Sequence, residues 1–474
     1  MLGSKNKSIS FLGAVILSTF LISCGQSPTV DLAINNVNVI DVLTGEVTHN
    51  QTILIKGDKI ANIIDSSDFD VVSARTTMDQ SGGYAIPGLW DMHIHLRGQG
   101  LASENREMLN HYLGYGITAV RDAAGDLPED VIKWRRDINS GHMVGPKIFT
   151  SLQKLDGVDA SWAGSIPVTT LDEIGPAIEE LIPSDPDFYK IYTSRLDSKL
   201  FLPMVRAIRE KGYKVTAHLP LDIAFDDAIE AGLSGIEHAM YLHKAASIND
   251  NALSKALREG AGRRGFTPFI ETFDRDHALK TFRKMAKSGM AITPTLYVDY
   301  LLSFLDENDH KGDVELLNIP LNFQQTYEGR VNRAAQKTAE NWESDHARMK
   351  ETMSLTPLLE EAGVLVLAGS DSGAFNSYTY PGDSLHQELR LLVESGMSTL
   401  GALQAATING AKWLEVESQF GSLEVGKAAD ILILGSNPLE DINATREAVG
   451  LIRAGQYIST EQLQEYKTLN PNLF

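Results

Sequence analysis

The 474-residue sequence contains a single cysteine, Cys24, and is short of basic residues. One cysteine excludes a disulfide bond within the chain, so stability has to come from packing. Lysine and arginine number 42 against 62 acidic residues, which gives a formal charge of −20. Nucleic-acid binding requires a basic surface, so this balance argues against a nucleic-acid partner. The remaining composition, with 43% hydrophobic and 22% charged residues, is ordinary for a globular protein.

The first residues predict an export signal. Lys5 and Lys7 precede an uncharged stretch, residues 9–23, that is too short to span a membrane comfortably. Cys24 follows in the motif Leu-Ile-Ser-Cys, which resembles a bacterial lipobox. We therefore expect residues 1–23 to be removed and Cys24 to be lipidated. The mature protein would then carry a charge of −22 and be anchored in the bacterial cell envelope, at the periplasmic face or the outer membrane. The alternative is a secretory peptide with an incidental cysteine.

Alternating, turn-punctuated segments near both ends of the chain predict one small β domain. After a polar tether, residues 24–29, strand patterns occur at Asp31–Ile40, Thr52–Ile60, Lys427–Leu434 and Ala448–Ile458. Each segment alone would leave an apolar face uncovered. We expect residues 30–84 and 416–474 to combine into a β-sandwich, because the apolar faces of the two segments can then cover each other.

Between these segments, strand-like and helix-like stretches alternate over residues 85–415. The expected strands are Ala85–Leu96, Ile117–Asp122, Lys147–Ser151, Phe188–Tyr192, Lys214–Leu219, Gly235–Met240, Ala291–Leu296 and Val364–Ser370. Expected helices include Pro128–Ser140, Leu171–Leu181, Leu202–Lys211 and Asp222–Ala231. Eight such units predict a (β/α)8 TIM barrel of the α/β class, with a doubly wound sheet as the competing architecture.

Polar residues stand at the ends of these predicted strands, where a barrel carries its chemistry. His93 and His95 are two residues apart on the first strand, so both imidazoles project from the same face. The ends of four further strands carry Lys190, His218, His238 and Asp371. Singly, each of these has an ordinary explanation as a hydrogen-bonded core residue, a snorkelling lysine or a cap. A buried unpaired lysine is costly, however, and requires a partner or a chemical change.

Together these motifs resemble the amidohydrolase superfamily, in its imidazolonepropionase-like and prolidase-like branch. The resemblance covers residues 30–458. The motifs that carry it are Ile86-Pro-Gly-Leu-Trp-Asp-Met-His-Ile-His-Leu96, Gly116-Ile-Thr-Ala-Val-Arg-Asp122, Phe188-Tyr-Lys-Ile-Tyr192, Thr216-Ala-His218, Ile236-Glu-His238, Gly369-Ser-Asp371 and Ala405-Ala-Thr-Ile-Asn-Gly-Ala411.

The resemblance implies a centre of two divalent metal ions. Its ligands would be His93, His95 and Asp371 for the first metal, and His218 and His238 for the second. Lys190 matches the lysine that becomes carboxylated in binuclear members, and its carbamate would bridge the metals. Imidazolonepropionases are mononuclear and lack this lysine, so the protein is not expected to be one. Nitrogen and oxygen ligands suit zinc, although manganese, cobalt and iron accept the same ligand types.

By the same resemblance, a metal-activated hydroxide would hydrolyse an amide bond, with Asp371 taking the proton from water and returning it to the leaving group. A dipeptide or N-acyl amino acid is the expected substrate. A cyclic amide, a lactone or an ester is the enzymatic alternative, and a non-catalytic lipid-anchored binding protein is the alternative of another class. Four residues are candidate substrate contacts: Tyr241, Arg121, Tyr297 and His243. For Arg121 a structural ion pair is the favoured interpretation. Residues 298–362 form a long insertion that either covers the site or decorates the surface, and the sequence allows an oligomer.

Overall fold

The computed structural model describes residues 29–71 and 73–468. The expected signal peptide, the lipidation site Cys24 and most of the tether lie outside these residues. Within the two described ranges, no helix has both the length and the hydropathy needed to cross a membrane.

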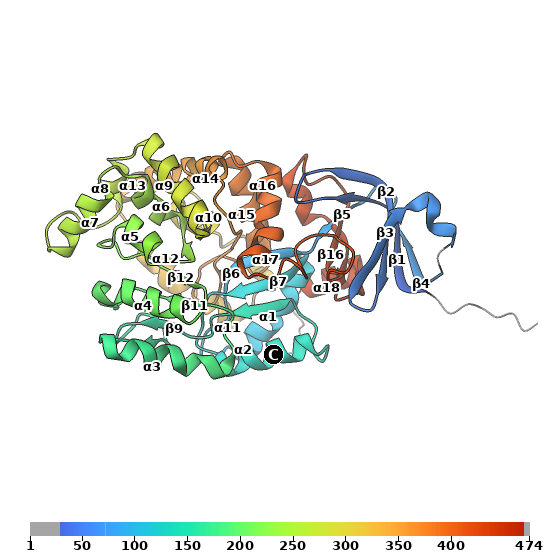
Figure 1. Ribbon diagram of the computed structural model, residues 1–474, viewed down its shortest axis with the longest axis horizontal. Coiled ribbons are helices and arrows are strands. Elements are labelled where there is room, and N and C mark those ends of the chain that lie inside the picture. Colours follow the sequence, from blue (N-terminus) through green and yellow to red (C-terminus); the bar gives the residue numbers. More distant parts are fainter. Residues whose placement is uncertain (1–28, 72, 469–474) are drawn as a thin grey trace, which may run out of the picture.

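Short parallel strands form the centre of the molecule (Figure 1). In chain order they are β6 (Leu89–His95), β7 (Ile117–Asp122), β8 (Lys147–Thr150), β9 (Lys154–Asp156), β11 (Tyr189–Ile191), β12 (Val215–Ala217), β13 (Gly235–Glu237) and β14 (Ala291–Thr293). Parallel pairing follows this order from β6 to β14, with β8 and β9 acting as two parts of one barrel strand. Nearly every residue in these strands is buried, as expected of a sheet that is covered on both faces.

Residues 364–370 close the circuit between β14 and β6. The Leu367 N–H donates to the Ile292 carbonyl at 2.8 Å, and the Met92 N–H donates to the Ala368 carbonyl at 2.8 Å. The predicted eighth strand is therefore in place, although it forms a single bridge rather than a continuous ladder. The predicted (β/α)8 fold is confirmed, and the doubly wound alternative is excluded.

Helices cover the outer face of the strands. They include α1 (Ala102–Gly114), α2 (Pro128–Asn139), α3 (Leu171–Leu181), α4 (Ser198–Glu210), α5 (Phe225–Glu230), α6 (Leu242–Ala246), α7 (Asp250–Arg258), α8 (Thr267–Ile270), α9 (Arg275–Ser288), α15 (Asp383–Glu394), α16 (Thr399–Ala405) and α17 (Ile408–Trp413). In α9 the Asp274 side chain accepts the His277 N–H at the start, and Gly289 takes a left-handed conformation (φ 75°) just after the end. The sequence thus specifies both ends of the helix.

The insertion is helical. It contains α10 (Leu296–Ser303), α11 (Leu321–Gln325), α12 (Glu328–Ala334), α13 (Ala339–Ser354) and α14 (Thr356–Ala362). The apolar residues of α10 and the buried Phe323 and Met349 belong to the main core cluster. The insertion is therefore packed against the barrel.

The two ends of the chain build one eight-stranded sheet, seen on the right of Figure 1. Its strands are β1 (Val30–Ile40), β2 (Val47–Lys56), β3 (Lys59–Asp65), β4 (Ala74–Asp79), β5 (Tyr84–Pro87), β16 (Ile431–Leu434), β17 (Ala448–Arg453) and β18 (Gln456–Ser459). The hydrogen-bonded order is β18-β17-β16-β5-β1-β2-β3, with β4 beside β1. The last helix, α18 (Thr460–Lys467), packs against α1.

The expected strand Ala85–Leu96 is divided at Gly88. Its first part is β5, which pairs with β1 and β16 in the small sheet, and its second part is β6, the first barrel strand. A Cβ at Gly88 would lie 2.3 Å from the Thr118 side chain, so only glycine fits where the chain passes from sheet to barrel. The sequence pattern did not show this division because apolar residues continue through it.

Aromatic side chains fill the end of the barrel at which the strands begin. Trp90 stacks on Phe149 with ring centroids 5.3 Å apart, and Phe188 meets Trp413 edge-on at 5.6 Å. The Trp413 indole N–H donates to the Ser234 carbonyl at 2.9 Å. We call these four aromatic residues the aromatic plug.

Candidate metal centre

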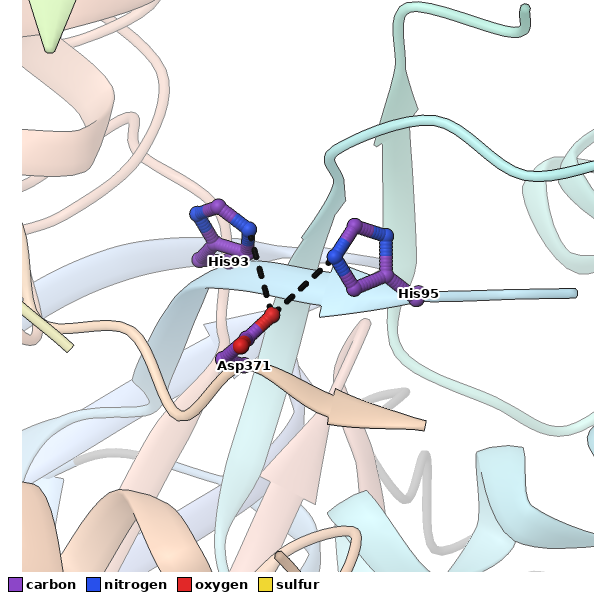
Figure 2. A group of neighbouring side chains, drawn as sticks. All are labelled: His93, His95 and Asp371. Atoms are coloured by element: carbon purple, nitrogen blue, oxygen red, sulfur yellow. Dashed lines mark ion pairs between the residues drawn. The ribbon is translucent and has the colours of Figure 1, made fainter. Parts of the chain in front are cut away.

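Two histidines and one aspartate meet where β6 ends and the eighth strand turns. Asp371 Oδ1 lies 3.0 Å from His95 Nε2 and 3.4 Å from His93 Nε2. Figure 2 shows both imidazoles directed at this carboxylate. The ligand atoms of the three residues lie within 4.8 Å of one another, and all three side chains are buried or nearly so. The histidine pair thus projects from one face of β6, as its spacing predicts.

Hydrogen bonds fix the orientation of both imidazoles. His93 Nδ1 donates to Glu237 Oε2 at 2.7 Å, and His95 Nδ1 donates to the Ala124 carbonyl at 2.9 Å. With Nδ1 protonated in each ring, the Nε2 lone pair is free to bind a cation. Glu237 is itself held by Arg121, whose Nη2 donates to both carboxylate oxygens at 2.9 and 2.8 Å.

His218 and His238 form a second pair beside the first group. Their Nε2 atoms lie 3.0 Å apart, and the ring of His238 lies 5.2 Å from that of His93 between centroids. His238 Nδ1 contacts Thr295 Oγ1 at 2.7 Å. Burial lowers the pKa of His218 well below its usual range and that of His238 to about 3. Both rings are therefore neutral in the folded protein, which is the form that binds metals.

Lys190, on β11, is fully enclosed beside these histidines. Its Nζ lies 3.7 Å from Glu237 Oε1, too far for a hydrogen bond, and has no hydrogen-bond partner in the described structure. Burial, the largest influence, lowers the pKa of Lys190 to about 8. This amine therefore loses its proton more readily than an exposed lysine does.

The chemistry of this donor set fits divalent cations. Buried polar atoms almost always have partners, yet His93 Nε2 and Lys190 Nζ have none among the described residues. Burial alone would raise the pKa of Asp371, but the hydrogen bond with His95 and the neighbouring histidines hold it well below its usual range. An ionised carboxylate and neutral imidazoles with converging lone pairs are the ligands that zinc and similar metals take.

Backbone strain is concentrated at the same place. His238 and Asp371 adopt left-handed conformations with φ of 73° and 54°, as do Thr295 (47°) and Ala124 (84°), which hold two of the histidines. Such angles are uncommon for residues other than glycine and persist where the surrounding structure imposes them. The strand ends are thus shaped to aim these side chains inward.

A cavity of about 230 Å³ opens onto the cluster. His95, Lys190, His218, His238 and Asp371 line it, while His93 lies behind Asp371. Tyr241, an expected substrate contact, also lines the cavity, with its ring 6.0 Å from that of His218. The insertion contributes Val298, Asp299, Leu302 and Arg330 to the walls, so it forms part of the site.

The structure places three other expected substrate contacts elsewhere. Arg121 is completely buried below the cavity and is bound to Glu237, so the structural ion pair is the correct interpretation. His243 is buried on α6, with Nε2 2.9 Å from Thr352 Oγ1. Tyr297 lines a separate cavity next to Tyr380. None of these three side chains lines the cavity at the candidate metal centre, because position after a strand does not determine which way a side chain points.

Comparison with known proteins identifies the family. The amidohydrolase family model matches residues 84–457. The chain belongs to the amidohydrolase family. Among solved structures, a Xaa-Pro dipeptidase with methionine bound in its active site has a TM-score of 0.65 at 21% identity, covering 90% of this chain and 99% of that one. Ochratoxinase from Aspergillus niger has a TM-score of 0.65 at 18% identity, covering 90% and 95%. At these identities the likeness concerns the fold alone.

Sequence relatives of this amidohydrolase match only part of the chain. Adenine deaminase from Staphylothermus marinus is 24% identical over 284 residues, which are 54% of this chain and 44% of that protein. Ochratoxinase from Aspergillus niger is 37% identical over 89 residues, 18% and 17% of the two chains. The chain thus spans less than half the length of these curated relatives.

Four residues of the amidohydrolase site were not predicted from the sequence. Glu237 stands inside the recognised Ile-Glu-His motif, and its position beside a ligand was the available signal. Arg97 follows His95 by two residues and lies on the same cavity. Lys154 and Arg330 also line the cavity, but nothing in their local sequence marks them.

Proposed function

We propose that the protein is a metal-dependent hydrolase that cleaves the amide bond of a dipeptide or an N-acyl amino acid. The observation that carries this proposal is the convergence of six candidate ligands at one end of the barrel, two of them with buried, unpartnered nitrogen atoms. The ligands proposed for the metals are His93, His95, His218, His238, Asp371 and carboxylated Lys190. When bound, two divalent cations would supply Lewis acidity for the carbonyl and lower the pKa of water to about 7.

Asp371 is the proposed proton carrier. It is ionised and directed into the cavity, so a carboxylate oxygen can accept the proton of the attacking water and return it to the departing amine. Tyr241 is the proposed partner of the substrate carbonyl or carboxylate, since its ring stands beside His218 at the cavity wall.

Lys190 is the proposed site of the bridging carbamate. Its uncharged amine would attack carbon dioxide, forming an N–C bond and releasing one proton to water. The product is an anion, which removes the cost of a buried unpaired cation. Lys190→Ala should abolish activity, and a short carboxylic acid such as propionate should restore part of it. Activity that persists in Lys190→Ala without added acid would contradict the carbamate.

Metal analysis and a substrate panel test the function. We expect two metal equivalents per chain and release of free amine from dipeptides or N-acyl amino acids. The panel should include a cyclic amide, a lactone, an ester and adenine. Turnover of the lactone or ester alone would favour the enzymatic alternative. Absence of metal after supplementation would favour the non-catalytic binding protein.

We further propose lipid attachment at Cys24 and anchoring in the bacterial cell envelope, on the evidence of the lipobox-like sequence. Wild-type protein should incorporate a labelled fatty acid and sediment with membranes, and Cys24→Ser should do neither. Equal labelling of Cys24→Ser would contradict the assignment.

A further inference from the structure

An excess of positive charge lines the cavity. Its basic residues are Arg97, Lys154, Lys190 and Arg330, and its acidic residues are Asp299 and Asp371. One of these acids is a proposed metal ligand, and Lys190 is accounted for by the carbamate. Three cations therefore remain in a protein whose net charge is strongly negative. Local charge in a cleft can oppose the net charge and select an oppositely charged ligand.

Lys154 is the most informative of the three cations. It lies on β9 directly beside Lys190, its backbone partner on β11, and its side chain is only 2% exposed. In the part of the chain that the structure describes, it has no hydrogen bond or ion pair, although it lines the cavity. Because a buried ammonium group without a partner is costly, its retention here points to a ligand that supplies the anion.

Arg330 and Arg97 are held together on the same cavity. The Oδ1 atom of Asn376 accepts a hydrogen bond from Nη2 of Arg97 at 2.7 Å and another from Nη2 of Arg330. Arg97 is also fixed by its Nε, which donates to the Ala374 carbonyl at 2.8 Å, and by its position 4.0 Å above the Trp162 ring. A neutral amide oxygen holds the two guanidinium groups in place without cancelling their charges, so both can still attract an anion.

The cations also lie next to the reacting centre. Nη2 of Arg330 is 4.0 Å from Asp371 Oδ2. A carboxylate bound by Lys154 and Arg330 would place an amide bond a few atoms away within reach of the metal ligands. Arg330 belongs to α12, so the insertion supplies a binding group to the barrel. The cavity volume of about 230 Å³ is small for a ligand pocket, and it suits a small substrate.

We propose that Lys154 and Arg330, supported by Arg97, bind the carboxylate of the substrate, and that the substrate is therefore an anionic amide. This inference rests on the proposed function. It distinguishes a dipeptide or N-acyl amino acid with a free carboxylate from neutral amides, lactones and purines. Apolar side chains of Met240, Val298 and Leu302 on the same cavity favour an apolar residue next to the scissile bond.

The test compares N-acetyl-L-leucine with N-acetyl-L-leucinamide on metal-loaded enzyme. Wild type should cleave the acid with a kcat/KM at least 10-fold above that of the carboxamide. Lys154→Met and Arg330→Gln should each raise KM for the acid about 10- to 100-fold, since a charge-assisted hydrogen bond is lost, with kcat little changed. Each variant should lower kcat/KM for the carboxamide much less than for the acid, because the carboxamide lacks the charge that the two residues bind.

Two exposed residues serve as controls, one of them on the same helix as Arg330. Arg333 is exposed on α12, one turn from Arg330, and Lys133 is exposed on α2. Arg333→Gln and Lys133→Met should leave KM for the acid unchanged. Equal turnover of acid and carboxamide by wild type, or equal losses on both substrates in Lys154→Met, would overturn the proposal while leaving amide hydrolysis intact.

A second measurement separates this inference from the proposed function. If wild type cleaves no amide, the same two compounds are stable ligands for calorimetric titration. Binding of N-acetyl-L-leucine at least 10-fold tighter than that of its carboxamide, lost in Lys154→Met and retained in Lys133→Met, would support the carboxylate site without catalysis. Equal binding of the two compounds would overturn it.

Discussion

The two ends of the barrel interior differ in their side chains: one end is packed with aromatic rings, and the other carries buried polar groups. At the end where the strands begin, the aromatic plug packs ring against ring, and the indole N–H of Trp413 is hydrogen-bonded. At the end where the strands finish, buried nitrogen atoms of His93 and Lys190 have no hydrogen-bond partner among the described residues, and two candidate ligands have strained backbone angles. One end contributes stability, and the other retains groups that cost stability and bind ligands.

A buried ion pair separates these two ends. The guanidinium carbon of Arg121 lies 5.1 Å from the ring centroid of Phe188 and 4.9 Å from that of Trp413, and its Nη2 donates to Glu237. Glu237 in turn orients His93. The plug is therefore connected to the metal centre through only two residues, which makes the contrast between the ends testable.

The largest expected effect is on catalysis at the polar end. His93→Ala should lower kcat/KM about 1,000-fold or more, because the loss of a metal removes several kcal/mol of transition-state stabilisation. Metal content per chain should fall in parallel, while the circular dichroism spectrum stays the same. Full turnover in this variant would contradict the ligand assignment.

The next effect is on stability at the aromatic end. Trp413→Ala should lower the free energy of unfolding by about 3–5 kcal/mol, since a large buried ring is replaced by a cavity. At 20 °C the folded fraction should keep its metal content. Urea unfolding and metal analysis check the two statements, and loss of metal from still-folded protein would show that the ends are not independent.

Glu237→Gln is expected to act on both ends, more weakly on each. Metal affinity should fall about 10- to 100-fold, because the residue that orients His93 loses its charge. The free energy of unfolding should fall by roughly 1–3 kcal/mol, since Arg121 keeps a hydrogen bond but loses its ionic partner. Thr281→Val, a buried polar change on α9, is the control and should leave metal affinity unchanged.

The smallest effect is a pH dependence that lies outside the metal centre. Burial lowers the pKa of His386 to about 3 and that of His243 to about 4, from 6.5. In the unfolded chain both rings take up protons as the pH falls below 6.5, whereas the folded protein resists this. The contribution of these two histidines to stability should therefore be constant above pH 7.5 and decline between pH 6.5 and 4. Urea midpoints at several pH values measure the slope, which His386→Asn should make shallower and substitution of the exposed His142 by Gln should not change.

The sequence contained enough information for the barrel and for the convergence of the candidate metal ligands, because strand periodicity and position at a strand end are local properties. The spacing of His93 and His95 places both side chains on one face of a strand, and the family resemblance implies their role as ligands. Arg330 could not be found in this way, since its place at the cavity depends on how a long insertion folds back on the barrel. Arg121 was a candidate substrate contact because it lies on a barrel strand. A charged residue on such a strand can lie above or below the layer of candidate ligands, and Arg121 lies below it, bound to Glu237. The division into β5 and β6 at Gly88 was not predicted, because Gly88 interrupts neither the apolar pattern nor the chain direction.

The pairing of β5 with β16 imposes an order of events on the newly made chain. Leu432 follows its partner Ile86 by 346 residues, so β5 emerges from the ribosome long before its neighbour exists. At about 5–20 residues per second this interval lasts roughly 20 to 70 seconds. Throughout it, the exposed side of β5 is an open template for strands of other chains. The last strands to be synthesised thus complete a sheet that the first ones began. Production of this protein should therefore depend on chaperones that shield nascent β-structure.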